Sequence, residues 1–130
     1  MIVLKFGGSS VDCASSIERV VGIVRGLLPR RPVVVVSAMA KTTRQLLKAA
    51  DAAAAGDLDL PTAWAIFAEL KEYHWREAHA AVPAAGHRVL AAMLEQRFAE
   101  LKALLTEMVA TDAFLISHSL FPKDSRLTRS

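Results

Sequence analysis

The first 55 residues alternate between short apolar runs and segments with helical periodicity. Ile2 to Phe6 is an apolar run with β-branched and aromatic residues, which predicts a buried strand, and Gly7 to Ser10 breaks it. Apolar residues then recur every three or four positions from Ile17 to Leu28, which predicts an amphipathic helix that Pro29 ends. The sequence from Ser15 to Glu18 fits a capping box, so we expect the helix to begin there.

A second strand and helix follow at once. Val33 to Val36 is an unbroken β-branched run, typical of a strand covered on both faces in a parallel sheet. Thr42 or Thr43 can cap the next helix, which we expect to reach about Ala55. The order strand, helix, strand, helix predicts a βαβ start to an α/β fold.

The rest of the chain is mainly helical. Two longer periodic segments, 62–82 and 87–110, predict a helical hairpin inserted after the second strand unit. Phe114 to Ile116 suggests a short apolar element. Residues 120–130 have no hydrophobic period and no core-forming run, so we expect a tail there.

Composition narrows the function classes. The 130 residues are 53% hydrophobic and 22% charged, which suits one globular domain, and the net charge of +3 is mild. Because no basic stripe is interleaved with aromatic residues, we expect no nucleic-acid partner. The lone Cys13 excludes an internal disulfide, and no Cys/His spacing predicts a metal site. Neither a long apolar span nor a signal peptide is evident, so we expect no membrane partner and a cytoplasmic location.

The strongest chemical signal is the glycine-rich loop that follows the first strand. Glycines let the backbone approach an anion closely, and the loop N–H groups and the helix behind them favour phosphate. Lys5 precedes Gly7 and Gly8, so its ammonium could bridge two phosphates. The motif is neither the P-loop nor the Rossmann pattern. A plain Gly-Gly turn with a solvated lysine is the alternative, but a lysine inside an apolar strand favours the phosphate site.

A second signal lies after the second strand. Ser37 stands at the strand end, where α/β sheets bind ligands, and Thr42 and Thr43 add hydroxyls at a helix start. Taken alone, this segment favours simple capping. With a right-handed crossover between parallel strands, however, we expect Lys5, Gly8 and Ser37 to converge at the carboxyl ends of the two strands.

Together the two segments resemble the aspartate kinases, within the wider amino-acid kinase family. The matching stretches are Val3 to Val11, Ile17 to Val24 and Val34 to Leu47, and the segment from Leu70 to His74 resembles part of the helical insertion of those kinases. The resemblance implies an α/β fold: the N-terminal part of an amino-acid-kinase-type sandwich, with a parallel sheet and an inserted helical hairpin at 62–110. Residues 1–119 would form a partial kinase domain.

The resemblance also implies an activity, the ATP-dependent phosphorylation of the aspartate side-chain carboxylate, the first step towards lysine, threonine and methionine. Ser37 and Thr43 would hold aspartate, and Mg²⁺ would enter with the nucleotide. Lys5 would be catalytic, because it would neutralise charge during transfer. The residues expected at the ATP phosphates are Lys5, Gly7, Gly8 and Ser9.

The chain departs from the family pattern near its end. Where those kinases have a serine–(any)–glycine–glutamate stretch that binds the substrate amino group, this chain has Ser119 for the glycine and Leu120 for the glutamate. We therefore expect a truncated chain, inactive alone, that self-associates through exposed apolar faces. The alternatives are a related kinase acting on glutamate, carbamate or a nucleotide monophosphate, and a non-catalytic fragment that serves as a binding piece.

Overall fold

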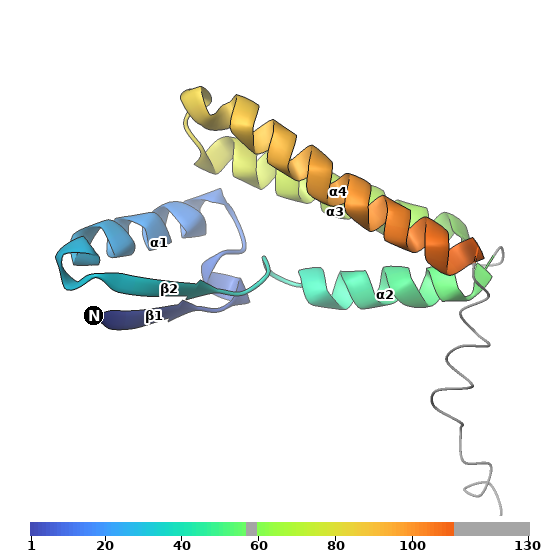
Figure 1. Ribbon diagram of the computed structural model, residues 1–130, viewed down its shortest axis with the longest axis horizontal. Coiled ribbons are helices and arrows are strands. Elements are labelled where there is room, and N and C mark those ends of the chain that lie inside the picture. The colour runs from blue at the N-terminus through green and yellow to red at the C-terminus, as the bar shows by residue number, and fades with distance from the viewer. Residues whose placement is uncertain (57–59, 111–130) are drawn as a thin grey trace, which may run out of the picture.

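The two predicted strands form one parallel sheet. The computed structural model describes residues 1–56 and 60–110, and Figure 1 shows their arrangement. Strand β1 (Ile2–Phe6) pairs with β2 (Pro32–Val36), in a register that sets Ile2 opposite Pro32 and Phe6 opposite Val36. The sequence prediction of two parallel strands is confirmed, and with four α-helices the described chain is a mixed α/β structure.

Helix α1 (Ala14–Leu27) makes the crossover between the strands and lies over one face of the sheet (Figure 1). It begins at Ala14, with Cys13 as the N-cap residue and no side-chain cap, so the capping-box prediction is wrong. The hydroxyls of Ser15 and Ser16 instead lie 3.2 and 3.4 Å from the Cys13 sulfur. A carboxylate from another helix, described below, takes the role of the cap.

Strand β2 is less covered than its sequence predicted. Val33, Val34, Val35 and Val36 keep 47, 40, 45 and 57% of their surface exposed. Side chains alternate between the two faces of a strand, and Val34 borders a hollow against Val20 and Val24 of α1. The opposite face carries Val33 and Val35. The prediction of a strand covered on both faces is therefore wrong for the described residues, since even Val34 and Val36, on the face towards α1, keep 40 and 57% of their surface exposed.

Three helices form a second layer. After α2 (Thr42–Ala54), helices α3 (Leu60–Ala81) and α4 (His87–Ala110) run back along each other, joined by the short turn η4 (Ala84–Gly86). Figure 1 shows α3 and α4 side by side above α2. The helical hairpin is confirmed, and α4 has the predicted bounds. Among the described residues, no helix is long and apolar enough to cross a membrane.

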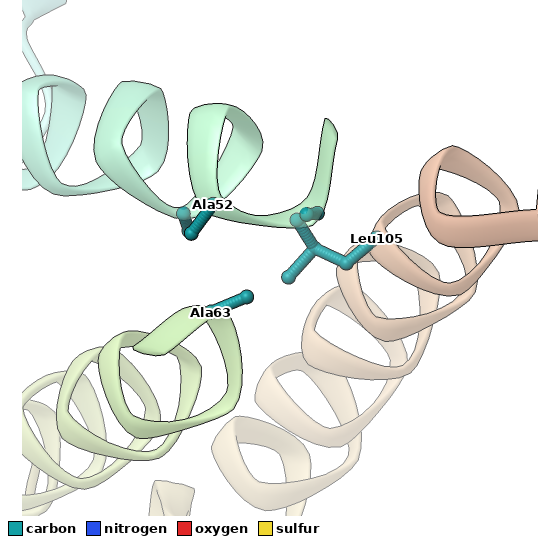
Figure 2. Close-up of a cluster of buried hydrophobic side chains, with 5 residues drawn as sticks. Ala52, Ala63 and Leu105 are labelled. Atoms are coloured by element: carbon teal, nitrogen blue, oxygen red, sulfur yellow. The ribbon is translucent and has the colours of Figure 1, made fainter. Parts of the chain in front are cut away.

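The buried core lies between these three helices. Figure 2 shows Ala52 of α2, Ala63 of α3 and Leu105 of α4 pointing towards one another. Small alanine side chains let the helix backbones approach closely, and Leu105 packs between them. The complete cluster is Ala49, Ala52, Ala53, Ala63 and Leu105. The predicted apolar element at 114–116 and the tail at 120–130 lie outside the described residues.

Candidate phosphate and carboxylate site

The glycine-rich loop forms a tight turn directly after β1. Gly7 is extended, and residues Gly8–Ser10 form a 3₁₀ turn, η1. The Ser10 N–H donates to the Gly7 carbonyl at 3.0 Å, and the Val11 N–H donates to the Gly8 carbonyl at 3.3 Å. Val11 is buried, with 7% of its surface exposed. The turn is thus held between a strand and a buried side chain, while Gly7 and Ser9 stay exposed.

The loop after β2 packs directly against this turn. The Ser37 N–H donates to the Phe6 carbonyl at 3.1 Å, and the Ala40 N–H donates to the Gly8 carbonyl at 3.2 Å. A Cβ atom added at Gly8 would lie 3.0 Å from the Ala40 carbonyl oxygen and 3.4 Å from that of Ala38. Only glycine allows this approach without a shift of the neighbouring backbone. The two loops singled out by sequence are therefore in contact.

Lys5 lies beside this junction. Its backbone pairs with Val35, two residues before Ser37, and it is exposed together with Val3, whereas Leu4 between them is half-buried. The alternation places Lys5 on the sheet face opposite α1, with Val35 as its cross-strand neighbour. This position is compatible with a lysine that reaches a phosphate at the strand ends. Its contact with ATP stays a prediction.

The two residues predicted to bind the substrate aspartate, Ser37 and Thr43, lie at the two ends of the loop after β2. The Ser37 hydroxyl donates to the Ala38 carbonyl at 2.8 Å, and Ser37 is exposed. Thr43 lies in the first turn of α2 and is also exposed. The prediction that Thr42 or Thr43 caps α2 is wrong: Lys41 is the N-cap residue, and the Thr42 hydroxyl donates to the Met39 carbonyl at 2.6 Å.

The surroundings of Thr43 suit an anion. Thr43 borders a surface hollow of about 510 Å³ whose lining includes Lys41, Arg44 and Lys48, with Asp51 as its single carboxylate. No acidic residue lies in the first turn of α2. The positive end of the helix dipole and the basic side chains therefore act in the same direction, which favours a carboxylate or phosphate near Thr43.

Two residues of α3 reach the segment that follows the glycine-rich loop. The Tyr73 hydroxyl donates to the Asp12 carbonyl, and Oε2 of Glu77 accepts a hydrogen bond from the Ala14 N–H at 2.8 Å. This carboxylate caps α1 from outside its own sequence. Sequence analysis missed both contacts. The four-residue spacing of Tyr73 and Glu77 places them on one helix face, but no local pattern pairs that face with a segment about sixty residues earlier.

Titratable groups gather around this segment. Hydrogen bonds with the hydroxyl of Ser15, and then with that of Ser16, lower the pKa of the Cys13 thiol. The Ser16 hydroxyl, followed by the Cys13 thiol, lowers the pKa of the Asp12 carboxyl. Burial raises the pKa of the Tyr73 hydroxyl, and the charge of Glu77 adds to that effect. Tyr73 therefore remains a protonated donor at neutral pH.

Metal-ligating side chains are not clustered in the described ranges. Within residues 1–56 and 60–110, no three His, Cys, Asp or Glu side chains are grouped so that they could hold a metal ion. The polar side chains of the two loops are the hydroxyls of Ser9, Ser10 and Ser37 and the ammonium of Lys41, a set that suits phosphate oxygens better than a metal cation.

Comparisons with known proteins show which sequences the chain resembles. Residues 1–126 match the profile of the amino acid kinase family. Two proteins of Arabidopsis thaliana, "Aspartokinase 2, chloroplastic" and "Aspartokinase 3, chloroplastic", are each 40% identical to the chain over 77 residues. The aligned part is 59% of this chain but only 14% of each relative, so the chain spans a small fraction of the proteins it resembles.

Proposed function

Since the chain belongs to the amino acid kinase family, we propose that it binds ATP at the glycine-rich loop and takes part in phosphoryl transfer to the side-chain carboxylate of aspartate. The observation that carries the proposal is the backbone junction between Gly8 and Ala40. It sets a phosphate-type loop against a loop whose hydroxyls and cations suit a carboxylate. Phosphoryl transfer requires such adjacency, because donor and acceptor oxygens must lie in line.

The proposed roles follow from these positions. The N–H groups of Gly7, Gly8 and Ser9 bind the ATP phosphates, and the Lys5 ammonium neutralises charge that develops during transfer. Mg²⁺, carried on the phosphates, supplies further charge neutralisation when the nucleotide is bound.

Ser37 and Thr43 orient aspartate, whose carboxylate oxygen attacks the γ-phosphorus while the bond to the ADP oxygen breaks. The product is an acyl phosphate. Because a carboxylate is already a nucleophile, the step needs no general base.

Aspartate is the acceptor that we favour because both Arabidopsis relatives are named aspartokinases. Glutamate, carbamate and nucleotide monophosphates are the competing acceptors. A cytoplasmic location stays a prediction, and the two relatives are named as chloroplastic. The family residue that binds the substrate amino group would fall at Leu120, outside the described residues.

Binding gives the test, because amide shifts report on each of the two loops separately. In ¹H–¹⁵N NMR titrations of the purified chain, MgATP should shift the amides of Gly7, Gly8 and Ser9. Aspartate should shift those of Ser37 and Thr43, more strongly than glutamate does at the same concentration. Lys5→Ala should weaken MgATP binding about tenfold or more, since a hydrogen bond to a charged group contributes about 1.5–3 kcal/mol.

A control variant distinguishes a specific role of Lys5 from the general effect of removing a positive charge. Lys102→Ala removes an exposed lysine of α4 and should leave the MgATP affinity unchanged. Lys5→Ala should also leave the aspartate response intact, because Lys5 is assigned to the phosphates. A wild-type chain whose loop amides do not respond to MgATP would refute the proposal, and a stronger response to glutamate would change the acceptor.

A further inference from the structure

We propose that Tyr73 and Glu77 of α3 are positioning residues for the phosphate loop. By holding the segment Asp12–Ala14, they fix the geometry of the N–H groups at Gly7–Ser10. The inference rests on the proposed function. It adds a role for the helical hairpin, to which the proposed function assigns none. The hairpin would tune phosphate affinity without itself touching the nucleotide.

The contacts are specific. The Tyr73 hydroxyl donates to the carbonyl of Asp12, and Glu77 Oε2 accepts from the Ala14 N–H at 2.8 Å. One carbonyl and one N–H, two residues apart on the backbone, are thus bound by side chains that are four residues apart on α3. Two such contacts fix both the position and the direction of the short segment between them.

The segment is close enough to the phosphate loop to transmit this constraint. Only Val11 separates Asp12 from the 3₁₀ turn, and Val11 is buried and donates its N–H to the Gly8 carbonyl at 3.3 Å. The other side of the turn is held by the Ala40 N–H. The loop is therefore bordered by β1, by the loop after β2, and by a segment whose position α3 sets.

The environment strengthens both contacts. The Glu77 side chain is 17% exposed, and its carboxylate sits at the positive end of α1, where charge and helix dipole attract. The Arg76 Nε lies 3.3 Å from the other Glu77 oxygen, and its guanidinium lies 5.7 Å from the centre of the Tyr73 ring. Arg76 thus supports the two positioning residues together.

A purely structural role makes a different prediction from a positioning role. If the contacts only stabilise the fold, their loss lowers the unfolding temperature but leaves the phosphate affinity of the folded chain unchanged. If they position the loop, the folded chain itself binds phosphate less tightly, because its N–H groups no longer converge. Affinity measured well below the unfolding temperature separates the two.

The probe is inorganic tripolyphosphate, titrated into the ¹⁵N-labelled chain and followed at the Gly7 and Gly8 amides. Tyr73→Phe and Glu77→Ala should each raise the Kd about three- to tenfold, the effect of losing one net hydrogen bond. Glu77→Gln should recover most of the affinity, since its amide oxygen can still accept from the Ala14 N–H. Unchanged amide shifts along α4 confirm that each variant is folded.

Matched controls lie on the same helix. Glu72→Gln and Trp75→Phe alter a carboxylate and an aromatic ring that border the cleft between α3 and α4, and they should leave the Kd unchanged. Should Glu77→Ala fail to fold, Tyr73→Phe decides, because it removes a single oxygen atom.

The outcomes separate the two proposals. A wild-type chain that gives no response at Gly7 and Gly8 refutes the proposed function. A wild-type response that Tyr73→Phe and Glu77→Ala leave unchanged, with only a lower unfolding temperature, overturns the positioning role alone.

Discussion

Gly8 lies so close to the backbone of residues 38–40 that no side chain fits there without a shift. Gly7, its neighbour, has no atom within 4 Å of where a Cβ would stand. The facing residue, Ala40, has a φ of 44°, a left-handed conformation that costs an L-residue about 1–2 kcal/mol. Strain at Ala40 and the absence of a side chain at Gly8 therefore belong to one junction between the two loops.

The two glycines should respond differently to alanine. Gly8→Ala should lower the free energy of unfolding by about 1–3 kcal/mol, because the new methyl group overpacks against two carbonyl oxygens. Gly7→Ala should change it by less than about 0.5 kcal/mol. Urea unfolding followed by circular dichroism measures both. Equal losses from the two substitutions would mean that the loops are not in contact in solution.

At the scale of elements, hydrophobic periodicity predicted the strands and helices correctly wherever a local sequence pattern determines them. The strands β1 and β2 and the helical hairpin were predicted within two residues at most ends. The capping of α1 was not predicted, because the Glu77 carboxylate that accepts from the Ala14 N–H lies 63 residues later in the sequence, beyond any local pattern. The exposure of the β2 valines was also missed, since a run of valines reveals strand propensity but not what covers the strand.

The candidate site shows the same division. The glycine-rich loop and Ser37 could be singled out because their chemistry is local, and the parallel register brings their loops together. The close approach of Ala40 to Gly8 could not be predicted, because it depends on the path of the chain after β2. The contacts of Tyr73 and Glu77 could not be predicted either, since these residues bind a segment that is distant in the sequence.

The three-helix layer offers a test of packing with adjacent residues. Leu105 has 2% of its surface exposed and fills the space between three helices, whereas Leu104 keeps 59% exposed. Leu105→Ala should lower the free energy of unfolding by about 2–5 kcal/mol, through lost burial and the cavity left behind. Leu104→Ala should cost less than about 1 kcal/mol. Thermal unfolding of the two variants gives the comparison, and similar losses would contradict the packing of α4 seen in Figure 2.

Considered as a whole, the molecule divides into a helical layer with a small core and a sheet with one open face. Val3, Val33 and Val35 share the face opposite α1, with 67, 47 and 45% of their surfaces exposed. In the described part of the chain, neither strand has a second neighbour. Open apolar faces and unpaired strand edges both favour association between chains.

We therefore predict concentration-dependent self-association through this face. In sedimentation velocity runs over increasing concentration, the wild-type chain should shift to larger species. Val33→Thr combined with Val35→Thr should remain monomeric at the same concentrations, because threonine keeps the strand propensity but adds hydroxyls. Val21→Thr, which changes an exposed valine of α1, serves as the control. A wild-type chain that stays monomeric throughout would contradict the prediction.

The hydrogen bonds from α3 to the segment after the glycine-rich loop also set an order of events during synthesis. Tyr73 follows Asp12 by 61 residues. At about 5–20 residues per second, the ribosome adds Tyr73 roughly 3–12 seconds after Asp12. Through that interval the Asp12 carbonyl and the Ala14 N–H have no partner on α3. The glycine-rich loop is thus made first but gains its contacts with α3 only after α3 has been synthesised, and a pause in translation before residue 73 would lengthen this delay.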